Sequence, residues 1–79
     1  MQFDVIVQEG SQRTHHHVTM TPAHYQQLTG GRVSPVRCVE AAFRFLLDHE
    51  PKESILGAFD ITVIAKYFPL FQQDIRRYL

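Results

Sequence analysis

A run of three histidines, His15, His16 and His17, holds the side chains best suited to binding chemistry in this sequence. Alternate side chains of a strand share a face, so His15 and His17 are expected to project together. The hairpin predicted from the flanking residues sets Asp4 directly across from His17. Two imidazoles and a carboxylate are ligands for Zn²⁺, Ni²⁺ or Cu²⁺, which predicts a metal site of His15, His17 and Asp4. The sequence favours the alternative, a solvated outer face with an Asp4–His17 charge pair, and contacts of these side chains with a partner are a third interpretation. His16 is expected in the core.

Nucleophilic catalysis is not indicated by any spacing in the sequence. The single cysteine, Cys38, is near the start of a predicted long helix, but it lies on an apolar stripe and is expected to be buried. No Cys/His, Ser/His/Asp or paired-carboxylate pattern brings a base to a nucleophile. Gly30-Gly31 follows a predicted helix and not a strand, which argues against a phosphate-binding loop. We therefore expect a protein that is not an enzyme and requires no cofactor.

The segment 2–20 predicts a β-hairpin. Phe3, Val5 and Val7 alternate with mostly polar residues, which is the period of a half-buried strand. Gly10-Ser11 has the Gly-first chemistry of a two-residue type II′ turn, so a second strand is expected from about Gln12 to Met20. The apolar face should carry Phe3, Val5, Val7, Thr14, His16, Val18 and Met20. The opposite face should carry Asp4, Ile6, Gln8, Arg13, His15, His17 and Thr19.

Two capping signals predict the next helices. Thr21 before Pro22 is an N-cap with proline at the first helical position, which predicts a helix from about Pro22 to Thr29 that ends at Gly30-Gly31. Ser34-Pro35 repeats this signal and begins the longest helix, about Pro35 to His49. Its apolar residues form two adjacent stripes, Val36, Val39, Phe43, Leu46 and Leu47, and Cys38, Ala42 and Phe45. The residues left for solvent are Arg37, Glu40, Ala41, Arg44 and Asp48.

The elements expected after Pro51 are shorter. Ser54 to Phe59 is expected to be a short helix or turn, and Asp60 resembles the N-cap of a helix that ends near Pro69. A last helix is expected from about Pro69 to Tyr78. The predicted fold is α+β, with an N-terminal two-stranded antiparallel β-hairpin packed on a cluster of four to five α-helices. We expect a single domain over 1–79, with the hairpin at 2–20 and the helical part at 21–79.

Composition limits the classes of partner. The 79 residues hold eight Lys and Arg against eight Asp and Glu, and this zero net charge offers no field to attract nucleic acid or an anionic membrane. No apolar run approaches the ~20 residues of a membrane span, and a lone cysteine fits a reducing compartment, so we expect the cytoplasm. A chain this short buries a small core, so we expect either a monomer close to its stability limit or a dimer.

The segment from His15 to Glu50 is similar to ribbon-helix-helix repressors in the order and length of its elements: a strand, a short helix, a glycine-containing turn and a helix capped by Ser34-Pro35. In that family two chains pair their strands, and outward strand side chains enter the DNA major groove. The resemblance implies this role for Arg13, His15 and His17. The sequence departs from the family in having a strand before this one, a ribbon with one arginine and no lysine, and no net charge.

The leading functional interpretation is a small interaction or regulatory domain that binds a protein partner or a second copy of itself. A DNA-binding regulator of ribbon-helix-helix type is the first alternative, and a weak divalent-metal-binding protein is the second. The tail from Glu53 to Pro69 is similar to short bacterial proteins that carry no assigned function, and that similarity implies no mechanism.

Overall fold

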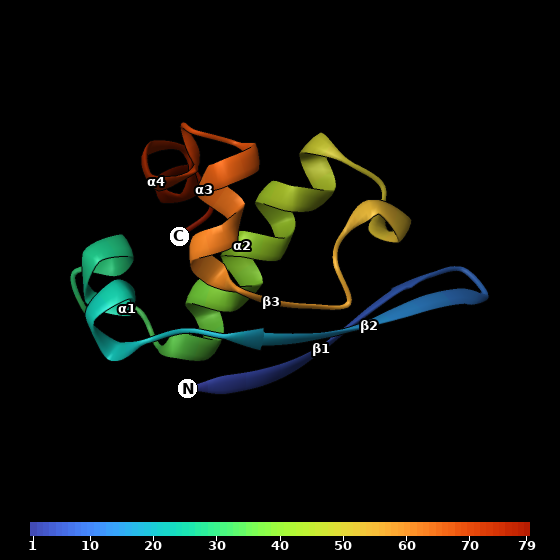
Figure 1. The fold of residues 1–79 in the computed structure, drawn as a ribbon, viewed down its shortest axis with the longest axis horizontal. Helices are drawn as coiled ribbons and strands as arrows, with labels where there is room; N and C mark the ends of the chain where they lie inside the picture. Colours follow the sequence, from blue (N-terminus) through green and yellow to red (C-terminus); the bar gives the residue numbers. More distant parts are fainter.

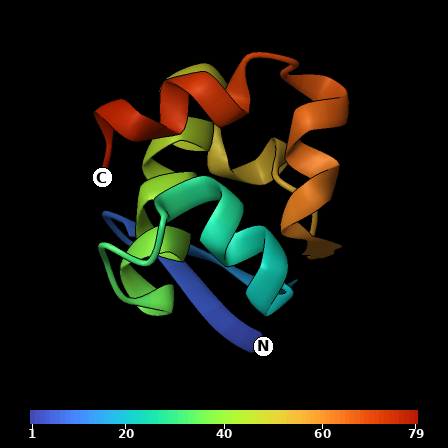
Figure 2. The same cartoon turned by 90° about the vertical axis from the view of Figure 1, so that its left-hand side faces the viewer.

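All 79 residues are described by a computed structural model, in which helices cover one side of a three-stranded sheet (Figures 1 and 2). The strands are β1 (Gln2–Glu9), β2 (Gln12–Thr19) and β3 (Ala58–Asp60), with β2 in the middle. The α-helices are α1 (Pro22–Thr29), α2 (Pro35–His49), α3 (Ile64–Tyr67) and α4 (Phe71–Asp74). Single 3₁₀ turns cover Lys52–Ser54, Ile61–Val63 and Ile75–Arg77. The fold is α+β, as predicted.

The predicted hairpin register is confirmed. β1 and β2 pair antiparallel, with Val5 opposite His16 and Asp4 opposite His17. Gly10 has a φ of 61°, the left-handed value that a type II′ turn requires at its first position. The two faces also divide as predicted: Val7, His16 and Val18 are buried, whereas the alternate side chains are exposed or half-buried.

The third strand corrects the prediction of a two-stranded ribbon. β3 runs parallel to β2, with Val18 opposite Phe59, and the amide of His17 donates to the carbonyl oxygen of Gly57 at 2.8 Å. This strand occupies the end of the segment predicted as a short helix or turn over Ser54–Phe59, which is therefore wrong there. Three residues are too few for strand alternation to be visible, and the pairing joins segments far apart in the sequence.

The predicted helix caps are confirmed. The Thr21 and Ser34 side chains accept from backbone amides three residues on, and Gly30 closes α1 in the left-handed conformation. Asp60 caps the turn that leads into α3, accepting from the Thr62 amide at 3.2 Å. These short local signals fix helix ends without help from the rest of the fold. No helix combines the length and apolar character needed to cross a bilayer.

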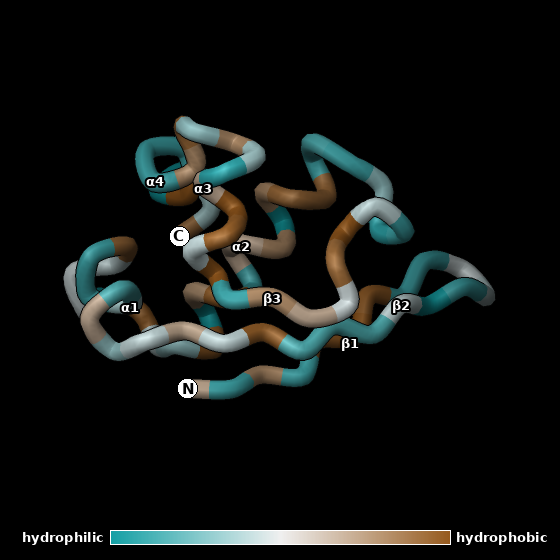
Figure 3. The backbone as a smooth tube through the Cα atoms, in the orientation of Figure 1, coloured by the Kyte–Doolittle hydropathy of each residue, from teal (hydrophilic) through white to brown (hydrophobic).

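The core lies between the sheet and α2, whose buried residues are Cys38, Val39, Ala41, Ala42, Phe43, Phe45 and Leu46. Figure 3 shows apolar residues concentrated in α2 and in the segment before β3, while the hairpin tip is hydrophilic. The prediction is wrong at two positions of α2, since Ala41 is buried and Val36 is 59% exposed. The buried face is therefore rotated towards Ala41, and Val36 stands in the first turn beside the sheet edge.

The C-terminal segments pack around one ring of α2. The ring centroid of Phe45 lies 5.0 Å from that of Phe71, 5.6 Å from Phe68 and 6.0 Å from Tyr78. The helices predicted up to Pro69 and from Pro69 to Tyr78 are each shorter, because α3 and α4 are single turns joined to 3₁₀ turns. Helices this short are not stable alone, so packing on Phe45 holds them.

Candidate functional site

The helix-free side of the sheet carries the cluster predicted from the histidine run. His17 Nδ1 lies 3.2 Å, and His15 Nε2 3.6 Å, from the same carboxylate oxygen of Asp4. The hydrogen bond from His17 is the main cause that lowers the pKa of Asp4, against the opposing effect of burial, and the charges of His17 and His15 add to it. The Asp4 side chain is 71% exposed, so water and salt screen these interactions.

The structure brings the predicted metal ligands together without arranging them as a metal site. No set of three or more His, Cys, Asp or Glu side chains is placed to hold an ion. Asp4 instead pairs with His15 and His17 directly, and metal binding by these three residues stays a prediction. Arg13 shares this face, opposite Gln8 on β1.

The position of β2 bears on the ribbon-helix-helix resemblance. The strand of that family that corresponds to β2 pairs with the same strand of a second subunit. In this chain β2 carries Arg13, His15 and His17. Here β2 is the central strand, paired with β1 on one edge and β3 on the other. Both edges of β2 are thus paired within one chain. β2 therefore has no free edge on which to form the two-chain ribbon of those repressors.

His16 points away from this face into the core, as expected. Its Nδ1 lies 2.7 Å from the carbonyl oxygen of Leu56, and its Nε2 lies 2.8 Å from the Thr14 hydroxyl. Because a carbonyl oxygen only accepts, Nδ1 carries a proton and donates it to Leu56, and Nε2 forms its hydrogen bond with the Thr14 hydroxyl. Both nitrogens are satisfied, so His16 ties β2 to the segment before β3.

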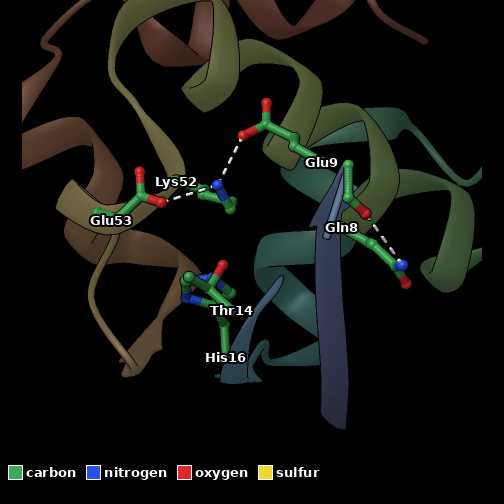
Figure 4. Close-up of polar contacts among 7 residues, drawn as sticks. Gln8, Glu9, Thr14, His16, Lys52 and Glu53 are labelled. Carbon is green, nitrogen blue, oxygen red and sulfur yellow. Dashed lines mark hydrogen bonds and ion pairs between the residues drawn. The ribbon is translucent and has the colours of Figure 1, made fainter. Parts of the chain in front are cut away.

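Lys52 is a buried charge that sequence analysis does not predict (Figure 4). Its side chain is 4% exposed, and Nζ donates to Glu53 at 2.7 Å and to Glu9 at 2.9 Å. The bonds to Glu53 and then Glu9 raise the pKa of Lys52, and the bond to Lys52 lowers the pKa of Glu53. The pairing holds the tip of β1 against the Lys52–Ser54 turn. The adjacent Lys52-Glu53 gives no hint of Glu9, far away in the sequence.

Cys38 is buried, as expected, and its sulfur contacts the Met20 sulfur at 3.9 Å. Burial raises the pKa of the Cys38 thiol. A thiol that is both buried and protonated is a poor nucleophile at neutral pH, so Cys38 serves packing.

The outer edge of β1 is unpaired within the chain. Met1 and Met20 exchange both backbone hydrogen bonds, and in an antiparallel ladder such pairs recur at every second residue. Phe3, Val5 and Val7 therefore bond to β2. The intervening residues direct their N–H and C=O groups away from β2, towards the open edge: Gln2, Asp4, Ile6 and Gln8.

Comparison with known proteins assigns no function to this edge. No protein-family model, curated protein or solved structure shows significant similarity to the chain. The function is therefore argued from the surfaces that the chain itself presents.

A groove of about 450 Å³ runs along the edge on its helix side. It is lined by Gln2, Phe3, Asp4, Val5, Ile6, Val36, Val39 and Glu40. Val36 and Ile6 are 59% and 57% exposed, the first on α2 and the second on the helix-free face of β1. The free backbone groups are thus flanked by apolar side chains on both sides.

A second apolar cleft, of about 390 Å³, opens between the C-terminal end of α2 and α3. Its lining is Leu46, Glu50, Ser54, Ile55, Leu56, Phe59, Tyr67 and Phe68. Leu56 and Tyr67 stand at its rim and are 48% and 68% exposed. The cleft suits an apolar side chain, and the one strand that borders it, β3, has only three residues.

Proposed function

We propose that this protein is a non-enzymatic interaction domain that binds an extended segment of a protein partner along the free edge of β1. The observation that carries the proposal is the direction of the backbone groups of Asp4 and Ile6, which point away from β2. Backbone N–H and C=O groups are obligatory hydrogen-bonding groups, and another strand satisfies a whole row of them at once.

The two edge strands of the sheet differ in how well they are protected from pairing with a strand of another chain. Natural edges are protected by shortness, by charged side chains, Lys above all, by Pro, or by bulges. β3 at one edge has three residues, whereas β1 at the other has eight, with no Lys, Arg or Pro and an unbroken register against β2. β1 is therefore the edge open to strand addition, and Asp4 is the charge in its middle.

Side chains beside the edge supply contacts for an added strand. Alternate residues of the incoming segment would face the groove next to Val36, and the others would lie beside Ile6. Covering these apolar side chains removes them from water and adds to the backbone bonds. The result is recognition by main-chain hydrogen bonds, with selectivity from small apolar side chains on both faces.

Amide hydrogen exchange tests the proposal residue by residue. The probe is a panel of synthetic peptides with alternating apolar and polar residues. We expect a binding peptide to slow exchange at the Asp4 and Ile6 amides and to leave the Val5 amide, already bonded to β2, unchanged. The variant Val36→Lys should lose this binding.

The matched control is Leu70→Lys, because Leu70 is as exposed as Val36, at 59%, and lies outside the groove. This control should bind peptide like the wild type. Peptides that bind without protecting Asp4 and Ile6, or that bind Val36→Lys equally well, would place the interaction elsewhere and refute the proposal. The proposal would also be refuted if no peptide of the panel bound and if, in addition, the Asp4 and Ile6 amides exchanged freely at every protein concentration.

A further inference from the structure

We infer that the strand added to β1 is β1 of a second copy of the chain, so that two copies form a two-fold dimer with one continuous sheet. This inference rests on the proposed function and names its partner. A two-fold axis pairs the strands antiparallel and makes each contact occur twice. The register of such a dimer is therefore limited to a few symmetric choices, which the residues of β1 distinguish.

The outward backbone groups of one strand must meet those of the other. With Gln2, Asp4, Ile6 and Gln8 pointing outwards, the symmetric registers with most overlap are centred on Asp4, Val5 or Ile6. Centring on Asp4 sets that carboxylate opposite its own copy, which is destabilising. Centring on Ile6 sets Glu9 opposite Phe3 on the helix-covered face.

The register centred on Val5 has neither fault. On the helix-covered face it pairs Val5 with Val5 and Phe3 with Val7, so that apolar side chains meet apolar side chains. On the helix-free face Asp4 lies opposite Ile6, and the two glutamines at the ends of the overlap pair with each other. An unrelated partner does not require β1 to be compatible with its own reversed copy.

The remaining exposure beside β1 also fits a second copy. Phe3 and Val5 are half-buried although they face the helix layer, and Val36 above them is 59% exposed. A copied strand in the Val5-centred register brings its own Phe3 and Val5 next to these residues and closes the groove from the open side. The zero net charge means that two copies approach without long-range repulsion.

Sedimentation equilibrium across micromolar to millimolar protein tests the dimer. We expect wild type to shift from monomer to dimer as its concentration rises. Val36→Lys should weaken association about tenfold or more, because the lysine is desolvated at the seam. Ile6→Glu should also weaken it, because it sets a second carboxylate opposite Asp4 of the other copy. Leu70→Lys should associate like wild type, and circular dichroism should show that all three variants are folded.

A disulfide tests the register. The Val5 pair would be a non-hydrogen-bonded antiparallel pair, with Cα atoms about 4.5 Å apart, which suits a disulfide. In a Cys38→Ala background, Val5→Cys should cross-link two chains on mild oxidation. Ile6→Cys should cross-link far less, because Ile6 then faces Asp4 of the other copy.

The outcomes separate this inference from the proposed function. Wild type that stays monomeric at every concentration overturns the second copy, and peptide protection of the Asp4 and Ile6 amides would leave the proposed function standing. A dimer that is insensitive to Val36→Lys and Ile6→Glu overturns the β1 seam. Cross-linking through Ile6→Cys and not Val5→Cys overturns the Val5-centred register. Concentration-dependent dimers, weakened by Val36→Lys and by Ile6→Glu and linked through Val5→Cys, support it.

Discussion

The ring of Phe43 packs α2 against β2 and β3, and the cost of removing it can be estimated. Phe43 is 5% exposed, and its centroid lies 5.3 Å from the ring of His16 and 6.0 Å from the ring of Phe59. Phe→Ala in a core costs about 3–5 kcal/mol, from lost burial and the cavity left behind. A chain of 79 residues has about 4–12 kcal/mol of stability in all, at ~0.05–0.15 kcal/mol per residue. Phe43→Ala should therefore remove between about a quarter and all of the free energy of unfolding.

Thermal and urea unfolding followed by circular dichroism measure this loss. At about 4–8 °C for each kcal/mol in a domain of this size, we expect the Tm of Phe43→Ala to fall by at least ~12 °C. Val36→Ala on the same helix is the control, and its 59% exposure predicts a change within about 0.5 kcal/mol. Equal melting of Phe43→Ala and wild type would refute the placement of Phe43 between α2 and the sheet.

Three further predictions concern charged and titratable side chains. Lys52→Met should lower the Tm at neutral pH. Wild type should keep this advantage between about pH 4.5 and pH 10.5, lose it in alkali as pH rises through the raised pKa of Lys52, and lose it in acid as pH falls through the lowered pKa of Glu53; melting curves across pH check this. Calorimetry should show Zn²⁺ binding that is micromolar or weaker, with an affinity that falls as the pH falls. Equally weak binding by the double variant His15→Ala/His17→Ala would remove the metal site, whereas nanomolar binding by wild type alone would establish it. Duplex DNA should bind weakly at physiological salt, and a salt-sensitive, sub-micromolar gel shift lost in Arg13→Ala would contradict this.

Local signals explain what the sequence predicts correctly. Gly10-Ser11 sets the hairpin turn, and the alternation on either side of it then fixes the pairing of Asp4 with His17. Thr21 and Ser34 mark their helix starts by their own side chains. Such features depend on a few neighbouring residues and survive whatever the rest of the chain does.

Features set by tertiary contacts could not be predicted in the same way. β3 forms because β2 offers its second edge to a segment about forty residues away, and Lys52 is buried because Glu9 reaches it from the hairpin tip. Val36 fits an apolar stripe by spacing, yet it stands over an edge where the chain supplies no covering element. The error at Val36 thus coincides with the surface to which we assign function.

The exchange rates of the Asp4 and Ile6 amides, measured against protein concentration, test the central claim most directly. Both amides point to the open edge of β1, whereas those of Phe3 and Val5 are bonded to β2. Strand addition by a second copy predicts that Asp4 and Ile6 exchange fast in dilute protein and slow down as the concentration rises, and that Val36→Lys moves this slowing to concentrations at least about tenfold higher. Fast exchange at both amides, unchanged by concentration and by strand peptides, would contradict a binding edge at β1.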